Sequence, residues 1–116
     1  MDMLFWRFDL RLTHTWTIAS KLGPGGGGGM DDFPVGLLEL RDKNGVMGLG
    51  EAAPSTRYEE NPDTVLDFLN QVDAARLSFA DIPGSMAYLD SIAPGQYAPK
   101  CAVNIALLDG AARAAG

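Results

Sequence analysis

The first part of the chain alternates apolar and polar residues with a period of two. Between Leu4 and Ile18 the odd positions are mostly charged residues or threonines, and the even positions are Leu4, Trp6, Phe8, Leu10, Leu12, His14, Trp16 and Ile18. This period predicts a strand, or two strands in line, with the even side chains on a core and the odd side chains toward water. Because such a stretch would extend about 50 Å, we expect a bend or bulge near Thr13 to Thr15.

Two shorter strands follow, at about Val35 to Asp42 and at about Val46 to Glu51. The Asn44-Gly45 pair between them is a strong hairpin signal, because Asn and Gly tolerate positive φ at both central positions of a tight turn. Together the three strands predict an antiparallel meander. Gly48 and Gly50 would weaken the third strand unless they serve a bulge or a close approach of another backbone.

Helical signals come after the strands. Asn61 is the expected cap of the first helix, with Pro62 in the first turn and Asp63 favoured by the helix dipole. The apolar stripe of this helix consists of Val65, Phe68, Leu69 and Val72. A shorter helix opens at Ile82 and ends before Pro94-Gly95. Its inward residues are Met86, Leu89 and Ile92.

A third helix, rich in alanine, begins near Pro99. Asp109 and Arg113 have the spacing of a helical ion pair. One face carries Cys101, Ile105, Leu108 and Ala112, and it is wide enough to contact both the sheet and a further domain. Cys101 is the single cysteine, so an internal disulfide is excluded. We expect this thiol to be buried among its small apolar neighbours.

Composition and charge exclude several classes of function. The 116 residues fit one domain, and the net charge of −6 comes without a cluster of Lys and Arg, which argues against nucleic-acid binding. The amino terminus lacks the pattern of a secretion signal, and no window approaches the roughly 18 apolar residues of a membrane helix. We therefore expect a cytoplasmic protein with neither nucleic acid nor membrane as a partner.

The glycine run from Gly23 to Gly29 separates the first two predicted strands. It lacks the spaced glycines of a dinucleotide site and the Gly-Lys-Ser/Thr ending of a phosphate loop. Two interpretations remain, a flexible linker and a flap that closes on substrate and carries Lys21 with it.

Few other residues suggest chemistry. His14 lies on the apolar face of the first strand without a recognisable partner, so a hydrogen-bonded, partly buried histidine is favoured over a catalytic base. Asp31-Asp32 and Glu59-Glu60 are interpreted as solvated charge rather than a cation site. For Glu51 a structural role is favoured over a ligand contact. The Arg57-Tyr58 pair offers a carboxylate-binding fork and an amphipathic ring, and a ligand-facing role and an exposed loop pair are equally supported.

The segments from Leu12 to Ser20 and from Asn44 to Tyr58, with the alanine-rich final helix, resemble the capping domain of the enolase superfamily. The similarity is greatest to the muconate-lactonizing subgroup, and within it to the dipeptide epimerases typified by L-Ala-D/L-Glu epimerase. The resemblance covers essentially the whole chain. It implies an α+β fold in which a three-stranded antiparallel meander is followed by about three helices.

The resemblance also implies that residues 1–116 are the amino-terminal cap of an isomerase whose carboxy-terminal TIM-like barrel is absent. In such a protein the barrel binds Mg²⁺ through acidic residues, and its lysines remove and return the α-proton of a dipeptide or related carboxylate. The 116 residues alone are then expected to be inactive and to contain no catalytic or metal-binding residue. The complete protein is expected to be a homo-oligomer.

In that family two loops of the cap cover the mouth of the barrel, and by position they match Ile18 to Gly29 and Ala53 to Tyr58. The substrate-binding residues implied are Ile18, Ser20, Lys21, Leu22, Arg57 and Tyr58. The chain departs from the family pattern in the glycine run, and also at Asn104, where an acidic residue is common.

Two alternatives stay open. The chain could be a free-standing module that binds another protein through the exposed face of its last helix. It could also be the cap of a cycloisomerase or an o-succinylbenzoate synthase, which share the same type of domain.

Overall fold

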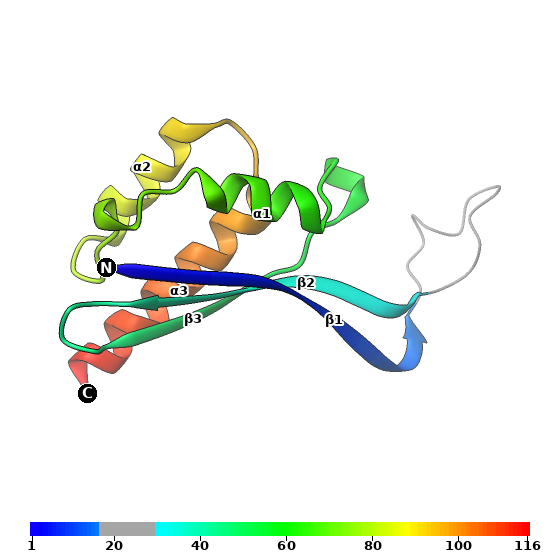
Figure 1. Ribbon diagram of the computed structural model, residues 1–116, viewed down its shortest axis with the longest axis horizontal. Coiled ribbons are helices and arrows are strands. Elements are labelled where there is room, and N and C mark those ends of the chain that lie inside the picture. Colours follow the sequence, from blue (N-terminus) through cyan, green and yellow to red (C-terminus); the bar gives the residue numbers. More distant parts are fainter. Residues whose placement is uncertain (17–29) are drawn as a thin grey trace.

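One antiparallel sheet with helices on one of its faces forms the molecule (Figure 1). The computed structural model describes the backbone of residues 1–16 and 30–116, and the side chains of residues 1–11 and 32–116. The sheet order is β1-β2-β3, so the predicted meander is confirmed. The elements are β1 (Asp2–Trp16), β2 (Met30–Arg41), β3 (Met47–Ala52), η2 (Thr56–Tyr58), α1 (Pro62–Asn70), η3 (Ala74–Arg76), α2 (Ile82–Ile92) and α3 (Tyr97–Ala115).

Strand β1 is long and pairs with β2 over most of its length. The register runs without interruption from Asp2 opposite Arg41 to Arg11 opposite Asp32, and then shifts before Trp16 pairs with Met30. The shift between Arg11 and Trp16 agrees with the irregularity expected near Thr13 to Thr15. It leaves the far end of the β1–β2 ribbon beyond the part of the sheet that the helices cover (Figure 1).

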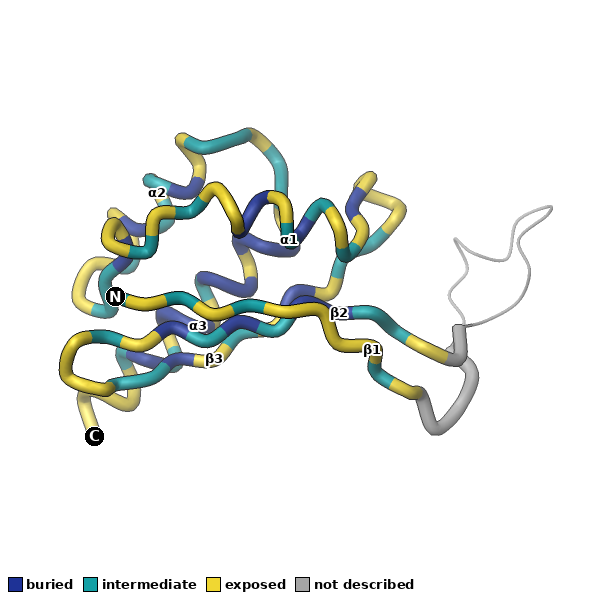
Figure 2. The backbone as a smooth tube through the Cα atoms, viewed as in Figure 1, coloured by how far each residue is buried: buried dark blue, intermediate teal, exposed yellow. Residues whose placement is uncertain are grey.

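The helices cover the opposite face of β1 from the one predicted. Met3 and Phe5 pack against the core, whereas the side chains of Leu4, Trp6 and Phe8 are 59%, 39% and 48% exposed. Figure 2 accordingly shows no buried residue in the described part of β1, residues 2–11. The expectation that the even residues face the core is wrong, because both faces of β1 are apolar near its start and alternation alone does not say which face the helices cover.

The hairpin between β2 and β3 is wider than the tight turn predicted. Gly45 has a φ of 80°, and its N–H donates to the carbonyl of Asp42 at 3.1 Å, which leaves Lys43 and Asn44 as the central residues. The carboxylate of Asp42 accepts the N–H groups of Asn44 and Val46, both at 2.9 Å. Positive φ at both Asn44 and Gly45 was therefore the wrong expectation. The Asp42 side chain stabilises a longer turn that needs a left-handed residue only at the glycine.

Both shorter helices begin and bury their residues as the pattern predicts. Asn61 and Thr64 form a reciprocal capping box at the start of α1. The Asp81 carboxylate accepts the N–H of Gly84 at the start of α2. Buried in the core are Val65, Phe68 and Leu69 of α1 and Leu89 of α2, with Val72, Met86 and Ile92 packed at its margin.

Helix α3 turns a different face to the sheet than expected. Its buried residues are Ala98, Pro99, Lys100, Ala102, Val103, Ala106, Leu107 and Gly110. Ile105 and Leu108 are 45% and 54% exposed, and Cys101 is exposed as well, so the prediction of a buried cysteine is wrong. The alanines rather than the larger residues face the sheet because β3 lies too close to the helix for longer side chains.

Two glycines of β3 make this close approach possible. A Cβ atom on Gly48 would lie 1.9 Å from the carbonyl oxygen of Ala106, and one on Gly50 would lie 2.0 Å from that of Ala102. Asp109 adds a polar contact, because its Oδ2 accepts the N–H of Leu49 at 2.9 Å. The sequence-based suggestion that these glycines serve a close backbone approach is therefore confirmed.

Candidate substrate-binding loop

The loop between β3 and α1, residues 53–60, carries the predicted pair Arg57 and Tyr58. The carbonyl of Ser55 accepts the N–H groups of Tyr58 and Glu60 at 3.0 and 3.1 Å. The hydroxyl of Ser55 accepts the N–H of Arg57 at 3.3 Å. Glu59 ends the η2 turn in the left-handed region, with a φ of 59°. The loop is thus closed on itself by backbone hydrogen bonds.

Arg57 and Tyr58 both face solvent from this turn. Tyr58 is 58% exposed, and the Arg57 guanidinium carbon lies 6.0 Å from the centre of its ring. Within the described residues Arg57 forms no ion pair. Its guanidinium donors are therefore available to a carboxylate, with an aromatic ring beside them.

Tyr97, which sequence analysis did not select, completes this surface. Its ring meets that of Tyr58 edge to face, with centroids 6.3 Å apart and an interplanar angle of 75°. Tyr97 is 67% exposed and stands at the first position of α3. One cation and two aromatic rings therefore lie together, an arrangement suited to a ligand with a carboxylate and apolar groups.

Glu60 contradicts the interpretation of Glu59-Glu60 as a solvated pair. Its residue is only 5% exposed, and its carboxylate oxygens lie 3.1 and 3.4 Å from the N–H of Ala98. The contact joins residues 38 positions apart, so no local sequence pattern predicts it. Glu59, by contrast, is exposed as predicted.

The predicted first loop lies within residues 17–29, outside the described residues. It includes the predicted residues Ile18, Ser20, Lys21 and Leu22 and the glycine run. The backbone of His14 belongs to β1, but its side chain is also outside them. The end of the β1–β2 ribbon, at Trp16 and Met30, and the η2 turn lie toward the same end of the molecule (Figure 1).

The remaining acidic candidates do not assemble into a site. Glu51 is exposed on β3, opposite Leu37. Asp32 lies 3.9 Å from Arg11, and both side chains are largely in solvent. In the part of the chain that the structure describes, no three His, Cys, Asp or Glu residues come together to hold a metal ion. The described residues thus do not fit a magnesium site.

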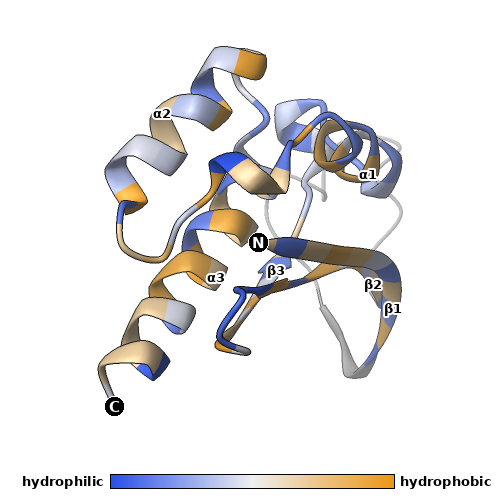
Figure 3. Cartoon of the chain, turned by 60° about the vertical axis from the view of Figure 1, so that its left-hand side comes forward, coloured by the Kyte–Doolittle hydropathy of each residue, from blue (hydrophilic) through white to orange (hydrophobic). Residues whose placement is uncertain are grey.

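Two surfaces of the molecule are apolar and open to solvent. One is the outer face of the sheet, with Leu4, Trp6, Phe8 and Leu49, and the other is the outer stripe of α3 around Ile105 and Leu108. Figure 3 shows the apolar character of both β1 and α3. Of the described helices, none combines the length and hydropathy that crossing a bilayer requires.

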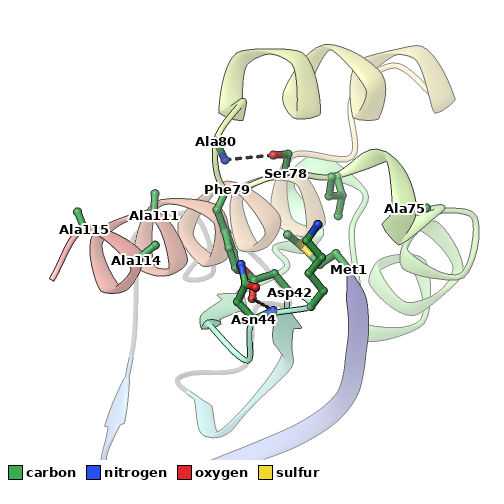
Figure 4. Close-up of a pocket in the computed structure, with 12 residues that line it drawn as sticks. Met1, Asp42, Asn44, Ala75, Ser78, Phe79, Ala80, Ala111, Ala114 and Ala115 are labelled. Atoms are coloured by element: carbon green, nitrogen blue, oxygen red, sulfur yellow. Dashed lines mark hydrogen bonds between the residues drawn. The ribbon is translucent and has the colours of Figure 1, made fainter.

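A hollow of about 800 Å³ lies among the β2–β3 hairpin, the loop before α2 and the last turns of α3 (Figure 4). Its labelled lining includes Phe79 and three alanines of α3. The carboxylate of Asp42 is used by the hairpin's own N–H groups. We assign no ligand to this hollow, because apolar residues supply most of its lining and the Asp42 carboxylate already has partners.

Comparison with known proteins identifies one group of relatives. No family model matches the chain. It is 53% identical over 116 residues to the L-Ala-D/L-amino acid epimerase of Pedosphaera parvula, a match that covers 100% of this chain and 32% of that protein. The chain therefore spans about a third of the length of this relative.

Solved structures with the same fold point in the same direction. A substrate-liganded complex of the L-Ala-D/L-Glu epimerase from Bacillus subtilis superposes with a TM-score of 0.84 at 20% identity, covering 100% of this chain and 32% of that one. The dipeptide epimerase from Cytophaga hutchinsonii, complexed with Mg and the dipeptide D-Ala-L-Val, gives a TM-score of 0.79 at 26% identity. That match covers 98% of this chain and 30% of the other.

Proposed function

We propose that this chain, which belongs to the enolase superfamily as an amino-terminal domain of the dipeptide epimerase type, is the substrate-specificity cap of an isomerase. The isomerase would epimerise dipeptides by removing and returning an α-proton. The observation that carries the proposal is the 53% identity, along the whole chain, to an epimerase about three times as long.

The proposal divides the work between two domains. The reacting lysines and the Mg²⁺ site would belong to a barrel domain outside these residues. Mg²⁺ would supply electrostatic stabilisation of the substrate carboxylate there. The cap would orient the substrate and exclude water at the barrel mouth. We extend the proposal to a cytoplasmic, homo-oligomeric protein.

Arg57 and the two tyrosines would be the cap's contribution to binding. Among the described residues the guanidinium of Arg57 has no ion-pair partner, and it matches a carboxylate in two-point geometry. Tyr58 and Tyr97 offer apolar ring surface beside it. The proposal also includes the four residues predicted from the first loop, Ile18, Ser20, Lys21 and Leu22, which lie outside the described residues.

A cap of a cycloisomerase or an o-succinylbenzoate synthase would have the same fold, so the fold does not separate these activities. A protein-interaction module is favoured by a different observation, the exposed apolar outer face of the sheet. The dipeptide epimerase remains our proposal because the 53% identity is measured over 116 residues, a span that includes the loop with Arg57 and Tyr58.

The test uses the longer protein that the proposal implies, in which this chain is followed by the barrel domain. Its variants are Arg57→Ala and Tyr58→Ala. We expect the KM for Ala-Glu dipeptides to rise about tenfold in Arg57→Ala, since a hydrogen bond to a charged group contributes roughly 1.5 to 3 kcal/mol. The kcat should change little, because the loop binds and does no chemistry. Lys43→Ala, which removes an exposed cation from the β2–β3 hairpin, is the matched control. Equal KM values in all three variants would disprove the role of the loop.

A further inference from the structure

We infer that Glu60 is a positioning residue for the loop of Arg57 and Tyr58. By binding the first turn of α3, its buried carboxylate sets where these two side chains stand and thereby the affinity for substrate. The inference rests on the proposed function for its kinetic consequence, but its structural part can be tested without a substrate.

The contact of Glu60 is made where a negative charge is most stable. Ala98 is in the first turn of α3, where unpaired N–H groups and the helix dipole favour an anion. The helix has no other side-chain cap, because Gln96, at the N-cap position, makes no such hydrogen bond. Both Glu60 oxygens lie within 3.4 Å of the Ala98 nitrogen, in surroundings that exclude most water. Low exposure strengthens this charge-assisted hydrogen bond.

The loop between Ser55 and Glu60 transmits this contact directly to Arg57 and Tyr58. The N–H of Glu60 donates to the carbonyl of Ser55 at 3.1 Å, so the residue that binds α3 also closes the loop. Glu59, next to it, holds a left-handed conformation that is strained for a non-glycine residue. Loss of the Glu60 carboxylate would free the loop to relax from this conformation.

Helix α3, which contains Ala98, the partner of Glu60, is fixed to the sheet. Helix α3 packs on the glycines of β3, and Asp109 binds the N–H of Leu49. Tyr97 lies one residue before Ala98 and contacts Tyr58, so a second contact joins the same loop to the same turn. Glu60 therefore holds the loop to a helix that packs closely on β3.

Three variants of the longer protein test this inference. Glu60→Ala removes the acceptor, Glu60→Gln keeps an acceptor without the charge, and Asn61→Ala removes the cap of α1 one residue away without touching the Ala98 contact. We expect a KM for dipeptide about fivefold to tenfold higher in Glu60→Ala, a smaller rise in Glu60→Gln, and little change in kcat. Asn61→Ala should leave KM near that of the parent.

Amide hydrogen exchange gives a readout that does not depend on the activity. Exchange at residues 56–60 and at Ala98 should accelerate in Glu60→Ala and less in Glu60→Gln, and in Asn61→Ala it should change no more than the lower global stability of that variant requires. Should the Ala variant fail to fold, the Gln variant still tests the contact. Unchanged exchange and KM in the Gln variant would overturn the inference.

The experiment distinguishes a failure of the proposed function from a failure of the positioning role of Glu60. If the unmodified longer protein does not epimerise dipeptides but exchange near residues 56–60 still depends on Glu60, the positioning stands and the substrate assignment falls. If the protein epimerises dipeptides and neither readout responds to Glu60, the positioning is wrong and the proposed function stands. In the double variant Arg57→Ala with Glu60→Ala, KM should rise by less than the product of the two single effects, because Glu60 acts partly through Arg57.

Discussion

Single residues decide how close α3 comes to β3. Gly48 and Gly50 face carbonyl groups of α3 with no room for a Cβ atom. Asp109 joins the two elements by accepting the N–H of Leu49 and the Nε–H of Arg113, the latter at 3.1 Å. The predicted pairing of Asp109 with Arg113 is thus confirmed, and its carboxylate has a second role that helical spacing alone does not reveal.

Gly50→Ala should destabilise the chain by about 1 to 3 kcal/mol, because the added methyl group forces β3 and α3 apart. The measurement is urea unfolding of the 116-residue chain followed by tryptophan fluorescence. Leu49→Thr, on the exposed side of the same strand, is the control and should change the free energy of unfolding by about 0.5 kcal/mol or less. Equal effects of the two substitutions would contradict the close packing.

The N–H of Leu49 and the guanidinium of Arg113 hold the pKa of Asp109 below its ordinary value. The folded-state pKa is therefore lower than the unfolded one, so this group stabilises the fold above the unfolded pKa and ceases to do so as pH falls through the folded pKa. We expect Asp109→Asn to be less stable at pH 7 and to lose less stability than the parent below about pH 5. Unfolding curves between pH 7 and pH 3 check this, with the exposed Asp67→Asn as control. Parallel pH profiles for parent and Asp109→Asn would refute it.

At the scale of elements, each helix start has its own chemistry. Helix α1 has the capping box of Asn61 and Thr64, and α2 has Asp81. Helix α3 relies on Glu60, from a loop far away in sequence. The first two helices are capped by side chains next to their own first turns. The start of α3 is instead hydrogen-bonded to Glu60 of the candidate loop.

Asn61→Ala should lower the stability by about 1 kcal/mol, since it removes the acceptor for the Thr64 N–H. Asn70→Ala, an exposed position at the other end of α1, should have a much smaller effect. Thermal unfolding of both variants measures the difference. A similar loss at both positions would mean that the capping box contributes nothing beyond helix propensity.

How far the elements were predictable depends on whether their signals are local. Strand alternation, the Asn61 cap and the stripe of Val65, Phe68 and Leu69 depend on neighbours within a few residues, and the structure confirms them. The buried faces of β1 and α3 depend on where distant elements pack, and both predictions were wrong. Arg57 and Tyr58 are on an exposed turn, which both the ligand-facing and the exposed-loop interpretation predict. Glu60 and Tyr97 were missed because the contacts that define them cross 38 and 39 residues.

For the whole molecule, the arrangement is a sheet covered on one face, with the candidate loop and the end of the β1–β2 ribbon toward the same end (Figure 1). The described residues contain binding groups but no metal-binding cluster. The relative with 53% identity is about three times as long. Under the proposed function, this chain would recognise the substrate and another domain would perform the reaction.

The most direct test compares exchange of the substrate α-proton by the 116-residue chain and by the longer protein. Each is incubated with L-Ala-D-Glu or L-Ala-L-Glu and Mg²⁺ in D₂O, and deuterium at the α-carbon is followed by NMR. We predict incorporation and epimerisation by the longer protein and neither by the 116 residues. Exchange catalysed by the 116-residue chain alone, or an inactive longer protein, would contradict the account.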